Sequence, residues 1–165
     1  MIRVDHAGEY GAMRIYEGQL AVLGRRPRDR KAASAIRRMA AQEARHLERF
    51  EKLVNEREVR PTALSPVWQV AGFALGAATA LLGVKAAMAC TASVEEVIDE
   101  HYARQIERLA GDPELKAAVT KFRAEEIEHR NEALAHGATE APRYRLLSES
   151  IKAGCRLAIR LSEKI

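Results

Sequence analysis

The stretch AEEIEHR, residues 124–130, places a glutamate on the apolar side of a helical pattern. Steps of one helical turn from Glu126 lead back to Phe122 and Val119, and forward to His129 and Ala133. A carboxylate in such a row loses its hydration, which is costly unless a partner neutralises its charge. His129 lies one turn away on the same face, as a metal chelate requires. The segment therefore predicts half of a buried metal site.

The same Glu-x-x-His unit occurs once more, in QEARHLERF, where it consists of Glu43 and His46. Ile36 and Met39 precede this pair on the same helical face, and Phe50 follows it. A single Glu-x-x-His motif is a weak signal, but two such motifs on apolar faces are a stronger one. The pattern indicates that both units point into the protein interior.

Two more inward glutamates lie on the helices that precede these units. Glu9, in DHAGEYGAMRIYEGQL, shares a helical face with Tyr16, and Glu95, in CTASVEEVIDEHY, shares one with Tyr102. Each half of the chain is therefore predicted to be a helical hairpin that carries Glu and then Glu-x-x-His. The two halves span about residues 1–60 and 88–138.

Other glutamates lie beside charged neighbours and are predicted to face solvent. Glu48, Glu96 and Glu125 belong to this group. The sequence thus distinguishes inward from outward glutamates, and the inward set with its histidines comprises Glu9, Glu43, His46, Glu95, Glu126 and His129.

The residue types of the inward set indicate which metal they bind. Four carboxylates balance two divalent cations, their oxygens can bridge two ions, and each imidazole adds one nitrogen ligand. Calcium and magnesium sites do not call for histidine, and structural zinc sites more often use cysteine. Iron or manganese fits best, with iron favoured if the site activates dioxygen. Hydrogen-bonded Glu/His pairs without metal are the alternative, but four inward carboxylates would then repel one another.

Helical periodicity runs through nearly the whole chain, and no alternating strand pattern is convincing. The short connections between helices favour antiparallel neighbours. The 165 residues are predicted to form one all-α domain, 1–165. Its helices are expected at about 4–23, 28–56, 66–86, 88–110, 113–136 and 142–163.

Residues 61–84 contain no charged side chain. A buried helix packed closely through Gly72, Gly76 and Ala80 is one interpretation. A helix lying in a membrane interface, with Trp68 near the head groups, is another. The segment is also long enough to span a bilayer, although a lone spanning helix would separate its neighbours in the bundle.

Composition narrows the function classes further. The net charge of +4 is modest, and the arginines form no basic block with interleaved aromatic residues, so nucleic-acid binding is not expected. Cys90 and Cys155 have no metal-ligand spacing and are predicted to be two buried thiols in a reducing compartment. Without strands, a Gly-x-Gly-x-x-Gly dinucleotide fold is excluded.

Four segments, DHAGEYGAMRIYEGQLAVL, QEARHLERF, AMACTASVEEVIDEHYARQ and AEEIEHR, together resemble the demethoxyubiquinone hydroxylase family, and the similarity covers almost the whole chain. These are ferritin-like di-iron monooxygenases of ubiquinone biosynthesis. The resemblance implies a ferritin-like four-helix bundle core with two additional membrane-associated or packing helices. It also implies that the six inward residues hold two iron ions, with Glu43 and Glu126 as the bridging carboxylates. Met13 departs from the smaller or polar residue expected one turn from Glu9.

The resemblance further implies hydroxylation of a 5-demethoxyubiquinol ring, with dioxygen as co-substrate and two electrons from an external donor such as NADH. Expected partners are a polyprenyl quinone and a membrane surface contacted peripherally. A eukaryotic member would add a lipid-binding partner protein and a ubiquinone-synthesis complex, and a homodimer is compatible with the sequence. The implied location is the cytoplasmic side of a bacterial cell membrane or the matrix side of the mitochondrial inner membrane.

Tyr102 lies two turns beyond Glu95 on the same face, and His101 precedes it. This pair is a candidate for proton or electron delivery near the metal. For Tyr102 the alternative is core packing with a satisfied hydroxyl, and for His101 it is surface exposure.

Two other functions remain open from the sequence. A soluble ferritin-like or rubrerythrin-like di-iron oxidase or peroxidase would keep the ligands but would not need an uncharged third helix. A metal-stabilised scaffold or membrane adaptor would have a closed site without an open coordination position.

Overall fold

The computed structural model describes all residues 1–165 and contains only helices, which confirms the all-α prediction. Two short 3₁₀ turns, η1 (Pro27–Asp29) and η2 (Ala138–Glu140), lie in connections between the helices. The six α-helices are α1 (Ile2–Leu23), α2 (Arg30–Glu56), α3 (Ser65–Leu81), α4 (Val84–Arg108), α5 (Pro113–Ala135) and α6 (Tyr144–Lys164).

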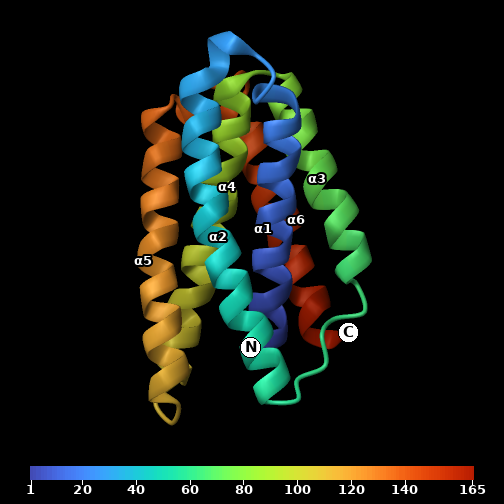
Figure 1. The fold of residues 1–165 in the computed structure, drawn as a ribbon, viewed down its shortest axis with the longest axis vertical. Coiled ribbons are helices and arrows are strands. Elements are labelled where there is room, and N and C mark those ends of the chain that lie inside the picture. The colour runs from blue at the N-terminus through green and yellow to red at the C-terminus, as the bar shows by residue number, and fades with distance from the viewer.

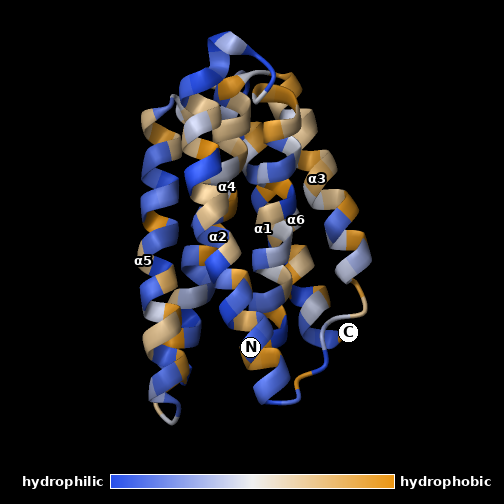
Figure 2. Ribbon diagram, in the orientation of Figure 1, coloured by the Kyte–Doolittle hydropathy of each residue, from blue (hydrophilic) through white to orange (hydrophobic).

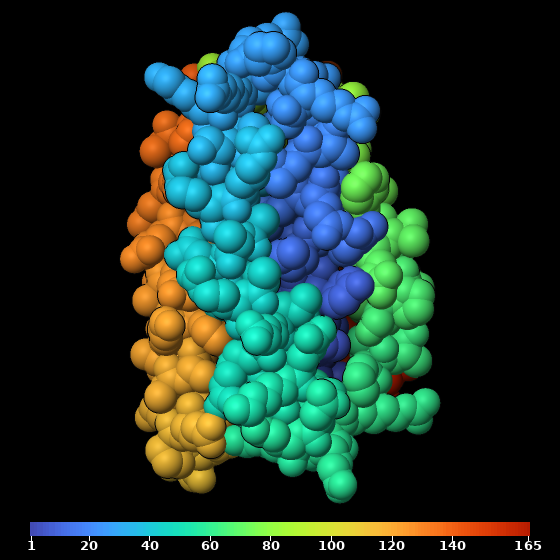
Figure 3. All heavy atoms as spheres, viewed as in Figure 1, coloured from blue at the N-terminus to red at the C-terminus, as the bar shows by residue number.

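Consecutive helices run in opposite directions, and both chain ends lie at the same end of the bundle (Figure 1). The hairpin α1–α2 and the hairpin α4–α5 form the core, while α3 packs on α1 and α6 packs on α4. In Figure 3 the viewed face is formed, from left to right, by α5, α2, α1 and α3. This arrangement is consistent with the expected ferritin-like helical bundle.

The predicted helix boundaries differ from the structure mainly between the third and fourth helices. The sequence placed the break near residue 87, whereas α3 ends at Leu81 and α4 begins at Val84. Gly83 makes the break because it adopts φ 113°, a conformation that side chains other than glycine rarely take. The start of α5 follows the predicted pattern: the Asp112 carboxylate accepts a hydrogen bond from the Leu115 amide, and Pro113 occupies the first turn.

Helix α3 lies unusually close to α1 because glycines face the contact. A Cβ atom at Gly76 would lie 2.0 Å from the carbonyl oxygen of Ile15, and one at Gly18 would lie 2.2 Å from that of Phe73. Gly72, Gly76 and Ala80 are buried, so the predicted close packing of residues 61–84 is confirmed for this face.

The opposite face of α3 is exposed and apolar. Val67, Val70 and Leu81 on this face, and Leu82 directly after the helix, are between 52% and 72% exposed, and hydrophobic colours run along much of this helix in Figure 2. None of the helices combines the length and the apolar character that crossing a bilayer requires.

The two larger of the three apolar clusters in the core form layers stacked along the bundle. One layer contains Met39 of α2 and Ala133 of α5, and the other contains Phe50 of α2 and Phe122 of α5. The buried residues that lie between these layers on both helices belong to the two Glu-x-x-His units. The bundle therefore holds its polar residues in a layer enclosed by apolar packing from both ends.

Candidate metal centre

The structure brings together all six residues of the inward set, from four different helices. Glu9 comes from α1, Glu43 and His46 from α2, Glu95 from α4, and Glu126 and His129 from α5. Each of them is at most 2% exposed. They form two groups suited to hold a metal ion: Glu9 and His46 belong to one, Glu95 and His129 belong to the other, and both groups include Glu43 and Glu126.

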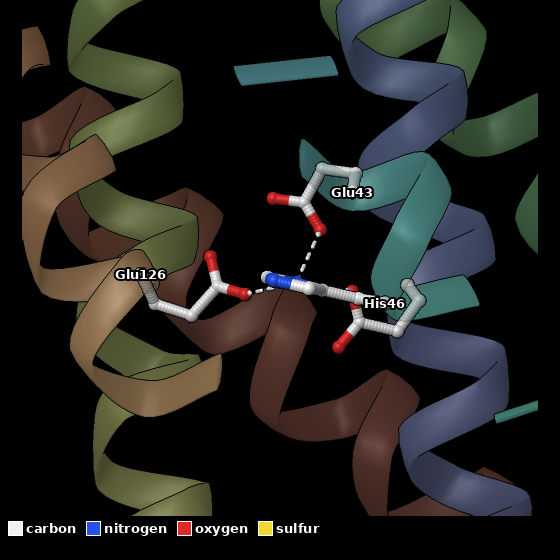
Figure 4. A group of neighbouring side chains, drawn as sticks. Glu43, His46 and Glu126 are labelled. Atoms are coloured by element: carbon white, nitrogen blue, oxygen red, sulfur yellow. Dashed lines mark ion pairs between the residues drawn. The ribbon is translucent and has the colours of Figure 1, made fainter. Parts of the chain in front are cut away.

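Glu43 and Glu126 each divide their two carboxylate oxygens between the two histidines. The Nδ1 atom of His46 lies 3.1 Å from Glu126 Oε1 and 3.5 Å from Glu43 Oε2. The Nδ1 atom of His129 lies 3.1 Å from Glu126 Oε2 and 3.1 Å from Glu43 Oε1. Figure 4 shows the Glu43 and Glu126 carboxylates turned toward the His46 ring from two sides. One oxygen toward each histidine is the arrangement of a carboxylate that bridges two metal ions.

Several polar atoms at the centre of this cluster have no hydrogen-bond partner. Both oxygens of Glu43, Oε1 of Glu126 and Nδ1 of His46 are buried and make no hydrogen bond; they face only the other potential ligand atoms. Buried polar groups nearly always make hydrogen bonds in native proteins, so a group of ligand atoms without them calls for a bound ion. Carboxylate oxygens and imidazole nitrogens also match the ligand preferences of iron and manganese. The residues present therefore fit a two-metal centre.

Glu9 and Glu95, the two glutamates that belong to only one group each, are both bonded to a tyrosine of the opposite hairpin. The hydroxyl of Tyr16 on α1 donates a hydrogen bond to Oε1 of Glu95 at 2.7 Å, and the hydroxyl of Tyr102 on α4 donates one to Glu9. Both tyrosines are about 1% exposed. Tyr102 thus lies beside the ligand set, as the sequence suggested. Tyr16 has the equivalent role, which the sequence analysis missed although it placed Tyr16 on the face of Glu9.

Burial and mutual repulsion favour protonation of several groups in the cluster. Burial, together with the negative charge of Glu43, raises the pKa of Glu9 to about 8. Burial and the charge of Glu126 raise the pKa of Glu95 well above its usual value. Although burial lowers the pKa of His129, its contacts with Glu126 and Glu43 outweigh this effect and raise it to about 9. A metal ion that binds here must displace these protons.

The outer nitrogens of the two histidines contact the residues that directly precede the shared glutamates. His129 Nε2 lies 2.8 Å from Oε1 of Gln42, and His46 Nε2 lies 2.5 Å from Oε2 of Glu125. The prediction that Glu125 faces solvent is therefore wrong: its side chain is only 19% exposed, because α2 and α5 are neighbours. Glu48 is exposed as predicted, and Glu96 is 40% exposed and pairs with Lys152.

His101 is turned toward the bundle rather than toward solvent. Its side chain is 13% exposed, and its Nε2 atom lies 2.9 Å from Oδ1 of Asp5. Gln105 donates a second hydrogen bond to Asp5 at 2.7 Å, and Asp5 is 2% exposed. The surface alternative for His101 is therefore wrong. Sequence reasoning missed Asp5, whose only signal was an acidic residue one turn before Glu9.

The two cysteines form no disulfide and belong to neither of the two groups of potential metal ligands. Cys90 is buried on α4, and Cys155 on α6 is partly exposed and packs against the same small apolar cluster as Cys90. The prediction of two buried thiols is therefore confirmed for Cys90, whereas Cys155 is only partly buried because it lies on the outer helix α6.

Comparison with known proteins assigns the chain to a family. The family profile described as "Ubiquinone biosynthesis protein COQ7" matches residues 1–162. The chain belongs to this family. The resemblance drawn from the sequence segments is thereby confirmed.

Among its relatives, the chain is 58% identical to a "3-demethoxyubiquinol 3-hydroxylase" of Rhodospirillum rubrum, over 99% of this chain and 76% of that protein. It is 53% identical to the human "NADPH-dependent 3-demethoxyubiquinone 3-hydroxylase, mitochondrial", over 100% of this chain and 76% of the human protein. It is 39% identical to the "5-demethoxyubiquinone hydroxylase, mitochondrial" of Saccharomyces cerevisiae, over 100% of this chain and 77% of that protein. All three relatives are named as hydroxylases of a demethoxyubiquinol or a demethoxyubiquinone.

Proposed function

We propose that this COQ7-family protein hydroxylates the ring of a demethoxyubiquinol, using dioxygen and electrons from an external donor, at a centre of two iron ions. The observation that carries the proposal is the division of the Glu43 and Glu126 oxygens between His46 and His129. The names of the bacterial, human and yeast relatives supply the substrate class.

The ligands would be distributed over two metal positions. Glu9 and His46 would hold one ion, Glu95 and His129 would hold the other, and Glu43 and Glu126 would bridge them. When bound, the two ions supply the redox chemistry that dioxygen activation requires, which no side chain of this protein can provide.

The protein's own residues prepare this chemistry by position and by exclusion of water. The near-complete burial of the six residues strengthens the electrostatic interactions between ligands and cations. The hydroxyls of Tyr16 and Tyr102 hold Glu95 and Glu9 in fixed orientations. In this proposal Tyr102 is a positioning residue for Glu9. His101, the residue before it on α4, contacts Asp5 on α1 and so helps to hold the two helices in place.

The electron donor is proposed to be a reduced nicotinamide nucleotide. The name of the human relative specifies NADPH, whereas the sequence analysis gave NADH as its example. Because the chain has no dinucleotide-binding fold, the nucleotide would bind without one or deliver its electrons through the quinone.

The exposed apolar face of α3 supports a peripheral contact with a membrane. Val67, Val70 and Leu81 lie on this face and Leu82 directly follows the helix, and a polyprenyl quinone is itself dissolved in the lipid phase. A helix that packs through glycines on one side and exposes apolar side chains on the other suits a bilayer surface. The proposed location is the surface of a bacterial cell membrane or of the mitochondrial inner membrane.

Anaerobic reconstitution tests the activity. The protein is loaded with ferrous iron, mixed with a short-chain demethoxyquinol, exposed to dioxygen, and its quinone products are separated by mass. A product heavier by one oxygen atom that carries label from ¹⁸O₂ supports the hydroxylase. Consumption of dioxygen without this product would instead favour the di-iron oxidase, and bound iron without any oxygen uptake would favour the scaffold.

A further inference from the structure

The two halves of the metal centre differ in one hydrogen bond. In both histidines Nδ1 faces the shared glutamates, and Nε2 points away from them. His46 Nε2 contacts a carboxylate oxygen of Glu125, whereas His129 Nε2 contacts the amide oxygen of Gln42. The two partners occupy equivalent places, since each directly precedes the shared glutamate of the opposite hairpin. The partner of the outer histidine nitrogen is thus a carboxylate in one half of the pseudo-symmetric site and an amide in the other.

This difference changes the ligand strength of the two imidazoles. If Nδ1 binds the metal, Nε2 carries the hydrogen and donates it outward. A hydrogen bond to a carboxylate is stronger than one to an amide and makes the imidazole more basic toward the metal. His46 is therefore the stronger nitrogen donor.

Apart from His46 itself, Glu125 has no close cationic partner. The nearest other basic group is the Lys121 ammonium, 4.0 Å from Glu125 Oε1, and the Lys121 side chain is 71% exposed. Water screens such an exposed pair, so it offsets little of the carboxylate charge. The Glu125 side chain itself is mostly covered, which keeps its interaction with His46 strong.

We propose that Glu125 makes the Glu9–His46 metal position the tighter of the two, so that the Glu125–Gln42 difference sets the order in which the centre fills. This inference rests on the proposed two-metal centre and concerns only the relative affinities of its two positions. Glu125 and Gln42 act through the histidines and are positioning residues.

Cobalt(II) titration of single-position variants tests the order. Glu95→Ala with His129→Ala leaves the Glu9–His46 position, and Glu9→Ala with His46→Ala leaves the other. Visible absorption then gives a dissociation constant for each. Outer partners of metal-bound histidines change metal affinity by about 10- to 100-fold, so we expect the Glu9–His46 position to bind cobalt about tenfold more tightly.

Exchange of the outer partners makes the test specific. Glu125→Gln should weaken the Glu9–His46 position to the level of the other, and Gln42→Glu should tighten the Glu95–His129 position. A purely structural role would not produce this gain. Glu128→Gln removes the same charge from an exposed place on the same helix and should change neither constant.

If the double variants do not fold, proteins that keep all six ligands provide a second measurement. Calorimetric titration of the unaltered chain should show two resolved binding steps, which Gln42→Glu should merge. Equal constants at both positions, or equal effects of Glu125→Gln and Glu128→Gln, would overturn the inference while leaving the hydroxylase proposal intact. Ordered filling without quinol hydroxylation would support the inference and overturn the hydroxylase proposal.

Discussion

The hydroxyl of Tyr102 on α4 donates a hydrogen bond to Glu9 on α1. Tyr16 on α1 makes the same contact with Glu95 on α4, so two reciprocal bonds tie the hairpins together at the layer of buried glutamates and histidines. Each tyrosine lies two turns after the glutamate of its own helix and bonds to the glutamate of the other helix. The arrangement explains why buried tyrosines, rather than phenylalanines, occupy both positions.

Tyr102→Phe is expected to weaken both folding and metal binding. Glu9 loses a buried hydrogen-bond donor, which should lower the unfolding free energy of the metal-free protein by about 1–3 kcal/mol. Metal affinity at the Glu9–His46 position should fall with it, because the carboxylate loses its fixed orientation. Urea unfolding and a cobalt titration measure the two effects. Tyr16→Phe should act on the Glu95–His129 position instead, and an effect of Tyr102→Phe on that position alone would contradict the assignment.

Glu126→Ala should remove metal from both positions at once, because this carboxylate faces both histidines. We expect metal content to fall well below two ions per chain and hydroxylation to be lost, while the helical circular dichroism remains. Glu128→Gln on the exposed side of α5 is the matched control. Two tightly bound ions in Glu126→Ala, with full turnover, would exclude Glu126 as a shared ligand.

The helical-face argument predicted which residues would meet in the centre, because a period of 3.6 residues fixes the side of the helix on which each side chain lies. It could not predict the partners across helices. The contacts of Gln42 and Glu125 depend on how α2 and α5 are rotated and shifted against each other. Glu125 lies at the flank of the apolar stripe beside charged neighbours, so its local pattern indicated solvent. The role of Asp5 likewise depends on the register of α1 and α4.

Stability of the metal-free protein should fall as the pH rises. The folded chain keeps protons that the unfolded chain has lost, since the pKa of Glu9 is about 8 instead of 4.5 and that of His129 is about 9 instead of 6.5. Folded protein therefore binds more protons than unfolded protein between about pH 4.5 and 9, and unfolding free energy decreases across this window by up to about 1.4 kcal/mol per pH unit for each proton.

Thermal unfolding at pH 6.5, 7.5 and 9 measures this dependence after removal of metal with a chelator. The metal-loaded protein is the control: its ligands are already deprotonated, so it should not lose stability in the same way. A metal-free protein that becomes more stable between pH 6.5 and 9 would show that the cluster is not protonated as inferred.

Membrane contact is expected to depend on the exposed face of α3. Val70 and Leu81 are 72% and 66% exposed there, so replacing both by serine should reduce flotation with anionic liposomes severalfold. Trp68 and Phe73 are less suitable targets, because the Trp68 indole donates a hydrogen bond to Ser162 and Phe73 packs under the Arg14 guanidinium. Leu134→Ser on α5, at the opposite edge of the bundle in Figure 1, is the control. Equal flotation of both variants would assign the contact to another surface.

Gly76→Ala should separate α3 from α1. The added methyl group would lie 2.0 Å from the carbonyl oxygen of Ile15, and a backbone atom in a packed helix cannot move aside as a flexible side chain does. The two helices must shift apart, which is expected to cost about 1–3 kcal/mol of unfolding free energy.

Gly154→Ala in α6 meets no atom within 4 Å and should instead stabilise the protein by up to about 1 kcal/mol, because alanine has the higher helix propensity. Urea denaturation of the two variants beside the unaltered chain checks the opposite signs. A Gly76→Ala protein as stable as Gly154→Ala would mean that α3 is not held by close backbone contact, and the exposed apolar face of that helix would then need a different support.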